Sequence, residues 1–249
     1  MLLEAEGLTK SFGGLVAVRG QGLRIEEGEI VALIGPNGAG KTTTFNLISG
    51  LYYPDAGAVR FKGVDITRSA PHVRCRMGIG RTFQIIQPFE NLSVLQNVLV
   101  GAIFGGAGRS GKNPEDVARN ACRMAGLGDR SHCMPGELTA AGLKKMELAR
   151  ALATSPDLLL LDEMMEGLTP VESAEVVGII KKVRDAGASI LLIEHVMRTV
   201  RDLSDRVVVM HQGETLAEGT YGEVVADPGV ITAYLGEDAE GDDFGHSGH

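Results

Sequence analysis

The amino-acid sequence predicts an α/β fold whose core is a mostly parallel sheet. Three short apolar runs, at residues 30–34, 157–161 and 189–193, have the length and composition of strands buried on both faces. Segments with helical periodicity separate these runs, and the first run leads directly into a glycine loop and a helix. The same patterns predict an N-terminal antiparallel β layer before this core and a small helical subdomain within it.

The N-terminal antiparallel layer is expected from strands at residues 2–5 and 23–25, joined through residues 9–19. Phe12 lies in this connection, next to two glycines. In a chain with only 4% aromatic residues, its ring offers a stacking surface for a base. Local sequence alone favours the alternative, in which Phe12 is a core residue.

A phosphate-binding loop follows the strand at residues 30–34. Residues 35–42 read GPNGAGKT and match G-x-x-x-x-G-K-[ST] in the required order of strand, loop and helix. The glycines let the backbone turn around an anion, and the helix starting near Lys41 adds its positive dipole end. Lys41 is expected to reach the β- and γ-phosphates, and the Thr42 hydroxyl to coordinate Mg²⁺. The predicted ATP-binding residues here are Gly35, Pro36, Asn37, Gly38, Ala39, Gly40, Lys41, Thr42 and Thr43.

Further strands are predicted at residues 58–61 and 79–83, and the latter strand contains Phe83 and leads to Gln84. The chain from about residue 90 to 154 is predicted to form the helical subdomain. Its parts are an amphipathic helix at 91–100 capped by Asn91 or Ser93, a flexible glycine-rich connection at 101–112, and helices at 114–125 and 143–154.

Charged residues follow two of the buried runs at their carboxyl ends. Asp162 and Glu163 come after residues 157–161, and His195 follows residues 189–193 after one intervening glutamate. Parallel strands and the phosphate loop present these ends at one edge of the sheet, so we expect the side chains to lie together. Adjacent acids point to opposite sides of a strand; Asp162 is therefore assigned to Mg²⁺ and Glu163 to an attacking water. His195, structural in most such positions, is interpreted as a γ-phosphate contact.

The C-terminal part is predicted to contain a helix at residues 171–186, a hairpin and two short helices. The hairpin strands are placed at 206–211 and 214–217, and the helices at 221–226 and 230–235. Residues 238–249 form an acidic tail whose composition predicts disorder.

Composition and charge narrow the function classes. The 249 residues suffice for one large domain, and no apolar run approaches the roughly 20 residues of a membrane-spanning helix. A net charge of −8 argues against a nucleic-acid partner, because phosphate neutralisation requires a basic surface. The three scattered cysteines are interpreted as free thiols. The first residues do not show the pattern of a secretory signal peptide, so we expect the protein to be located in the cytoplasm.

Together these motifs resemble the nucleotide-binding subunit of an ABC transporter over nearly the whole chain, residues 1–237. Several segments look most like the branched-chain (hydrophobic) amino-acid uptake group: KSFGGLVAV at 10–18, IGRTFQIIQPF at 79–89, LDE at 161–163, EHVM at 194–197, AEGT at 217–220 and YLG at 234–236.

The resemblance implies a P-loop NTPase core that uses ATP and Mg²⁺. By motif, Phe12 is the adenine-stacking aromatic and Val18 a further ATP contact. Gln84 links the nucleotide to the membrane partner and joins Thr42 and Asp162 around Mg²⁺. The implied catalytic residues are Glu163 as general base, His195, Gln84 and Lys41.

The resemblance further implies a dimer of two copies or two homologous subunits that close on two ATPs. A signature segment then binds the γ-phosphate held by the opposite subunit; its residues are Leu138, Thr139, Ala140, Ala141 and Gly142. The usual signature is L-S-G-G-Q, so both glycines here carry a methyl group and the Gln side chain is absent. We hypothesise that, in a heterodimer, the site completed by this signature hydrolyses ATP weakly.

The expected function is import of branched-chain or related amino acids, driven by ATP hydrolysis. The implied partners are transmembrane permease subunits and, indirectly, a solute-binding protein, with this chain peripheral on the cytoplasmic face of a bacterial inner membrane. Alternatives are an importer for urea, short amides or another small solute, a non-transport ABC ATPase, and an ATP-dependent scaffold. A single cassette, a short insert and an acidic net charge favour a transport function over the non-transport alternative. The altered signature leaves the scaffold as an open alternative.

Overall fold

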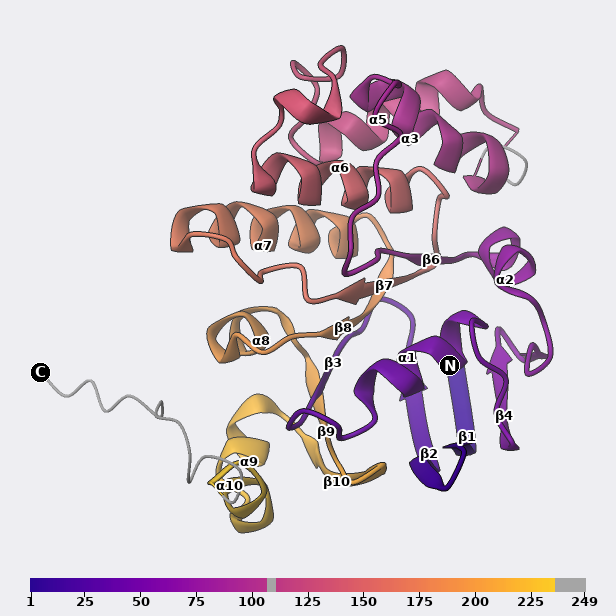
Figure 1. Ribbon diagram of the computed structural model, residues 1–249, viewed down its shortest axis with the longest axis vertical. Coiled ribbons are helices and arrows are strands. Elements are labelled where there is room, and N and C mark those ends of the chain that lie inside the picture. Colours follow the sequence, from indigo (N-terminus) through magenta and orange to yellow (C-terminus); the bar gives the residue numbers. More distant parts are fainter. Residues whose placement is uncertain (107–110, 236–249) are drawn as a thin grey trace, which may run out of the picture.

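A six-stranded sheet forms the centre of the molecule (Figure 1). The computed structural model describes residues 1–106 and 111–235, so the predicted tail at 238–249 lies outside the described residues. The strand order is β10-β9-β3-β8-β7-β6, and every neighbouring pair is parallel except β9 and β10. These strands are β3 (Ile30–Ile34), β6 (Ile79–Arg81), β7 (Leu158–Asp162), β8 (Ser189–Ile193), β9 (Arg206–His211) and β10 (Glu214–Gly219).

The three predicted buried runs are confirmed as β3, β7 and β8, with β7 displaced by one residue so that it ends at Asp162. Their side chains are buried on both faces, as expected for a parallel sheet with covered faces. Val31 and Leu33 of β3 pack toward one hydrophobic cluster, and Ile30 and Ala32 toward the other. This alternation places β3 and the loop that follows it in the middle of the core.

An antiparallel sheet of order β2-β1-β4-β5 covers one face of the central sheet. Its strands are β1 (Leu3–Phe12), β2 (Leu15–Ile25), β4 (Ala56–Phe61) and β5 (Val64–Asp65). The predicted connection at 9–19 was wrong, because β1 and β2 continue through it with register shifts and turn only at residues 13–14. Helix α1 (Lys41–Ser49) packs between the two sheets through Phe45, Leu47 and Ile48, which are fully buried.

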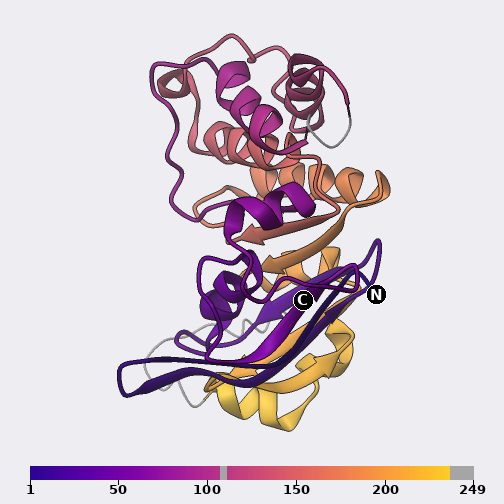
Figure 2. The ribbon, with the colours of Figure 1, turned by 90° about the vertical axis from the view of Figure 1, so that its right-hand side faces the viewer.

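Helices cover the opposite face, and α3, α5 and α6 pack on one another at the upper end in Figures 1 and 2. The elements of this layer are α3 (Val94–Gly101), the π-helix η1 (Ala102–Gly106), α5 (Pro114–Met124), the 3₁₀ turn η2 (Pro135–Glu137), α6 (Ala140–Leu152), α7 (Pro170–Asp185) and α8 (Met197–Leu203). Ser93 caps α3 through a capping box with Gln96. The connection predicted to be flexible at 101–112 begins with the last residue of α3 and the π-helix, and its residues 107–110 lie outside the described residues.

Two helices were absent from the sequence prediction, α2 (Pro71–Met77) and α8. Both are short, with seven residues each, so their periodicity is difficult to recognise. The chain continues past β10 into α9 (Tyr221–Val225) and α10 (Pro228–Leu235). The cysteines are free thiols, as predicted. No helix in residues 1–106 or 111–235 is long and apolar enough to cross a membrane.

Candidate functional site

The phosphate loop connects β3 to α1, and two of its glycines are required by the backbone. Gly35 has φ +145°, and a Cβ there would collide with the carbonyl oxygen of Met210 on β9. Gly40 has φ +99°, and a Cβ there would lie 2.5 Å from the carbonyl oxygen of Ala17 on β2. The loop is therefore wedged between strands of both sheets, in a conformation that favours glycine.

Lys41 begins α1 and lies inside the curve of this loop. Its Nζ donates to the carbonyl oxygens of Gly35 at 2.5 Å and Pro36 at 2.8 Å, and only 6% of the residue is exposed. Thr42, the next residue, is exposed, whereas Thr44 is buried beside Met210. The helix thus presents its N-terminal end, one ammonium group and one accessible hydroxyl at the loop.

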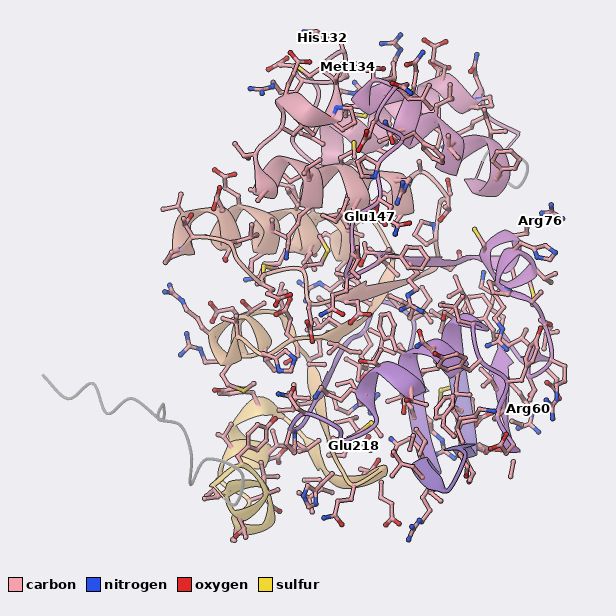
Figure 3. The ribbon with its side chains drawn as sticks, viewed as in Figure 1. Arg60, Arg76, His132, Met134, Glu147 and Glu218 are labelled. Carbon is pink, nitrogen blue, oxygen red and sulfur yellow. The ribbon has the colours of Figure 1, made fainter. Side chains whose placement is uncertain are left out.

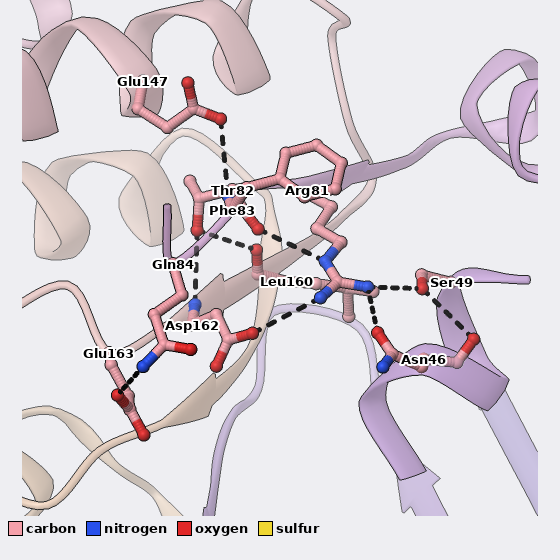
Figure 4. A network of polar contacts seen from close by, with 10 residues as sticks. All are labelled: Asn46, Ser49, Arg81, Thr82, Phe83, Gln84, Glu147, Leu160, Asp162 and Glu163. Atoms are coloured by element: carbon pink, nitrogen blue, oxygen red, sulfur yellow. Dashed lines mark hydrogen bonds and ion pairs between the residues drawn. The ribbon is translucent and has the colours of Figure 1, made fainter. Parts of the chain in front are cut away.

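The structure brings Gln84, Glu163 and His195 together from three separate segments. The Glu163 carboxylate accepts a hydrogen bond from Nε2 of Gln84 at 2.6 Å, and its other oxygen lies 2.6 Å from Nε2 of His195 (Figure 4 shows the Gln84 contact). Glu163 directly follows β7, and His195 follows β8 after one residue. Because β7, β8 and β3 are parallel neighbours, these residues and the phosphate loop leave the sheet at the same edge.

The backbone of Glu163 is held in an unusual conformation. Its φ is +48°, in the left-handed region that non-glycine residues rarely adopt. Its amide donates to the carbonyl of Ile193 at 3.0 Å, and its carbonyl accepts from Nζ of Lys144 at 3.1 Å. Lys144 also donates to the carbonyl of Glu166 at 2.6 Å. Such strain costs about 1–3 kcal/mol and persists where surrounding contacts over-determine it, typically at functional sites.

Asp162, at the end of β7, is 4% exposed and forms an ion pair with Arg81. Burial raises the pKa of the Asp162 carboxyl, while the guanidinium of Arg81 opposes that shift. Arg81 also lies with its charge over the rings of Phe45 and Phe83, at 4.9 and 5.1 Å from their centroids. The predicted metal ligand is thus oriented by a cation from the neighbouring strand β6.

The signature residues form the start of α6, which begins at Ala140 and not at residue 143 as predicted. Thr139 is the N-cap, and its hydroxyl accepts from the amide of Gly142 at 3.1 Å. This cap extends the helix backward through the signature. The start of α6 lies well away from the phosphate loop of the same chain in both Figures 1 and 2. The structure therefore does not bring residues 138–142 together with Lys41.

The two residues predicted to bind ATP outside the phosphate loop differ in exposure. The Phe12 ring is 42% exposed and meets Tyr52 edge-on, with centroids 5.2 Å apart. Val18, by contrast, is 0% exposed and packs in the core between the sheets. The expectation that Val18 contacts ATP is corrected here, because its side chain has no surface to offer a ligand.

Four charged residues around this site were not singled out from the sequence: Arg81, Lys144, Glu147 and Glu194. Glu194 is 4% exposed and accepts from the amide of Met165 at 3.0 Å, and burial raises its pKa to about 7. Glu147 is 1% exposed within α6. A charge in an otherwise apolar strand end or helix face is the sequence signal that could have identified them.

Comparisons with known proteins show what the chain is similar to. Residues 18–166 match the family described as ABC transporter, and residues 214–240 match the one described as branched-chain amino acid ATP-binding cassette transporter. The chain is 38% identical to the high-affinity branched-chain amino acid transport ATP-binding protein BraF of Pseudomonas aeruginosa, over 95% of this chain and 98% of that protein. It is 37% identical to the corresponding protein LivG of Escherichia coli, with the same coverage.

Solved structures that superpose on the chain include ATP-binding cassettes of ABC transporters. One, described as the ADP conformation of a cassette of an ABC transporter, superposes with a TM-score of 0.85 at 30% identity, covering 94% of this chain and 98% of that chain. A dimeric bacterial ABC transporter cassette superposes with a TM-score of 0.78 at 27% identity, covering 88% and 99%. The chain therefore belongs to the ABC transporter family and has the fold of its ATP-binding cassette.

Proposed function

We propose that this chain is the ATP-hydrolysing subunit of an ABC importer that powers uptake of branched-chain or related amino acids. The observation that carries the proposal is the Glu163 carboxylate, which contacts both Gln84 and His195 at the sheet edge where the phosphate loop begins. The amino-acid cargo rests on the relatives, which are named as branched-chain amino acid transport proteins.

ATP binding falls to the phosphate loop and Phe12. The loop amides and the N-terminal end of α1 attract the phosphates, and Lys41 supplies a positive charge within hydrogen-bond reach of the loop. The exposed face of Phe12 stacks on adenine, a contact that tolerates any base. Val18 supports this region from the core without touching the nucleotide.

Oxygen donors of Thr42, Gln84 and Asp162 fit Mg²⁺, which prefers oxygen ligands and commonly combines one or two carboxylates with substrate phosphates. When bound, Mg²⁺ neutralises charge on the β- and γ-phosphates. The accessible Thr42 hydroxyl and the carboxylate of Asp162, oriented by Arg81, suit this purpose. Gln84 donates through Nε2, so its carbonyl oxygen is the atom for a cation.

Glu163 acts as the general base for hydrolysis. It accepts a proton as the water oxygen bonds to the γ-phosphorus and the bond from that phosphorus to the bridging oxygen breaks, leaving ADP and phosphate. Gln84 and His195 hold the carboxylate through its two oxygens, and His195 contacts the γ-phosphate. The strained backbone of Glu163 serves to aim the side chain, because a misplaced base loses most of its effect.

The position of the signature supports an assembly in which each subunit completes the site of the other. Residues 138–142 lie apart from the chain's own loop, so they act on ATP bound by an opposing subunit, where the N-terminus of α6 attracts the γ-phosphate. We assign residues 1–237 to one ABC ATP-binding domain, with a helical subdomain at about 90–154. Membrane permease subunits dock near Gln84 and this subdomain, on the cytoplasmic face of the membrane, and a solute-binding protein delivers the cargo to them.

The deciding experiment compares ATP turnover of the purified chain and its Glu163→Gln variant in ATP and Mg²⁺, with the oligomeric state recorded. The function predicts turnover that is lost in the variant, and an ATP-dependent dimer that the variant retains. Absence of turnover despite tight ATP binding would show that a different subunit must complete the site. Turnover that survives Glu163→Gln would contradict the role of Glu163.

A further inference from the structure

The loop between β6 and α3 is held by polar side chains of two helices. From α6, Glu147 accepts from the amide of Phe83 at 3.3 Å and Arg150 donates to the carbonyl of Gln87 at 3.2 Å. From α3, the buried side chain of Asn97 bonds both the amide and the carbonyl of Phe89, at 2.8 and 3.1 Å. The backbone of this loop is thus fixed at three points.

Core packing contributes little to holding the same loop. Phe83, Ile85 and Phe89 keep 46%, 76% and 49% of their surface exposed. Apolar side chains with so much exposure cannot determine the path of the backbone by burial alone. The polar anchors therefore decide where the loop runs.

Glu147 is the most deeply buried charged residue among these anchors. Only 1% of it is exposed, and in Figure 3 it lies toward the middle of the view, whereas Arg60 and Arg76 lie at the margin. A carboxylate in such a place is costly unless it is paired and hydrogen-bonded. Arg150, one turn further along α6, forms the ion pair, and the amide of Phe83 supplies the hydrogen bond. The charge is thus compensated by groups that fasten α6 to the loop.

Gln84 directly follows Phe83, the residue whose amide is bound by Glu147. Its Nε2 reaches the Glu163 carboxylate at 2.6 Å, so the path from α6 to Glu163 runs through one backbone amide and one side chain (Figure 4). Thr139, the N-cap of α6, lies two helical turns before Glu147. One rigid helix therefore carries the signature at its start and the anchor of Gln84 in its middle.

We propose that Glu147 is a positioning residue that holds Gln84 against Glu163 and so ties the signature helix to the hydrolysis site of its own chain. The inference rests on the proposed function, because it assigns Glu147 to the same reaction. When α6 moves against the ATP of the opposing subunit, the hydrogen bond between Glu147 and the amide of Phe83 moves Gln84 with the helix.

The test uses three substitutions in the assembled transporter. Glu147→Ala removes the acceptor and is expected to lower kcat about tenfold with the KM for ATP changed less than about twofold, because a displaced group acts on the chemical step. Glu147→Gln keeps an acceptor for the Phe83 amide and is expected to restore kcat to within about threefold. Glu175→Ala is the matched control. Glu175 lies exposed on α7 and forms an ion pair with Lys145 of α6, the helix that carries Glu147.

A double-mutant cycle separates positioning from general damage. In a Gln84→Ala background, Glu147→Ala is expected to lower kcat no further, because the group it positions is already missing. If Glu147→Ala lowers kcat by the same factor with and without Gln84→Ala, the inference is overturned, while the ATPase proposal stays intact. An unchanged kcat on Gln84→Ala alone would overturn the role of Gln84 and the inference with it.

Amide hydrogen exchange of residues 83–89 in the chain alone gives a readout that needs no turnover. Exchange is expected to accelerate in Glu147→Ala and not in Glu147→Gln or Glu175→Ala. If Glu147→Ala does not fold, Glu147→Leu removes the acceptor while filling the space, and the same acceleration is expected. Unchanged exchange in the folded variant would overturn the inference whether or not the chain hydrolyses ATP.

Discussion

The guanidinium of Arg81 lies 3.3 Å from the carboxylate of Asp162, and both side chains are largely buried. Nη1 of Arg81 also donates to Asn46 at 2.6 Å and Ser49 at 2.8 Å, both on α1. One cation thus connects the helix of the phosphate loop to the carboxylate that ends β7, as Figure 4 shows. Its removal has consequences for stability as well as for the site.

Arg81→Met is expected to lower the free energy of unfolding by about 3 kcal/mol at pH 8, because it leaves the Asp162 charge buried without a cation. Urea unfolding followed by circular dichroism measures this change. The double variant Arg81→Met/Asp162→Asn removes the uncompensated charge and is expected to recover part of the loss. A loss below about 1 kcal/mol in the single variant would mean that water already solvates Asp162.

His195→Ala is expected to lower kcat by about 10² or more, because the Glu163 carboxylate loses one of its two holding contacts and the γ-phosphate loses a donor. His195 is half-exposed, so the folded chain is expected to tolerate the change. Steady-state turnover and equilibrium binding of ATP separate the two effects. A binding defect as large as the rate defect would assign His195 to nucleotide affinity instead of hydrolysis.

Glu194 predicts a specific dependence of stability on pH. Burial raises its pKa from 4.5 to about 7, so between these values the folded chain holds a proton that the unfolded chain has lost. The stabilising contribution is complete below about pH 4.5 and is lost as pH rises through about 7, a change of about 3 kcal/mol. Glu194→Gln removes this titration and keeps an acceptor for Met165. Its advantage over the parent chain in urea unfolding should therefore grow from pH 5 to pH 8; parallel profiles would contradict the assignment.

The altered signature predicts that the two ATP sites hydrolyse ATP at different rates if the dimer partner is a different subunit. Glu163→Gln in this chain is expected to remove most ATP turnover of the assembled transporter, because the partner's signature completes that site. The equivalent Glu→Gln change in the partner should remove less, since its ATP faces Thr139 and the two methyl groups of Ala140 and Ala141. ATPase assays of both variants provide the measurement, and equal losses would eliminate the hypothesis.

Much of the fold could be predicted because its signals are local. A strand, a glycine loop and a helix in sequence specify the nucleotide cradle, and three apolar runs specify a parallel sheet, whose geometry then collects their carboxyl ends at one edge. Gln84 joined this group only through the family resemblance, since a Gln between two apolar residues carries no local signal of a site. Val18 was misjudged for a related reason: motif position does not reveal burial.

The sequence by itself determined the phosphate loop and the three buried strands, because short-range periodicity and glycine placement encode them, and its motifs determined the family. Only the tertiary structure decided the left-handed backbone of Glu163, the pairing of Arg81 with Asp162 and the anchoring of Phe83 by Glu147. The last two contacts join residues separated by 81 and 64 positions. Such contacts depend on how helices and sheets pack, and a buried charge finds its partner only when that packing brings the two together.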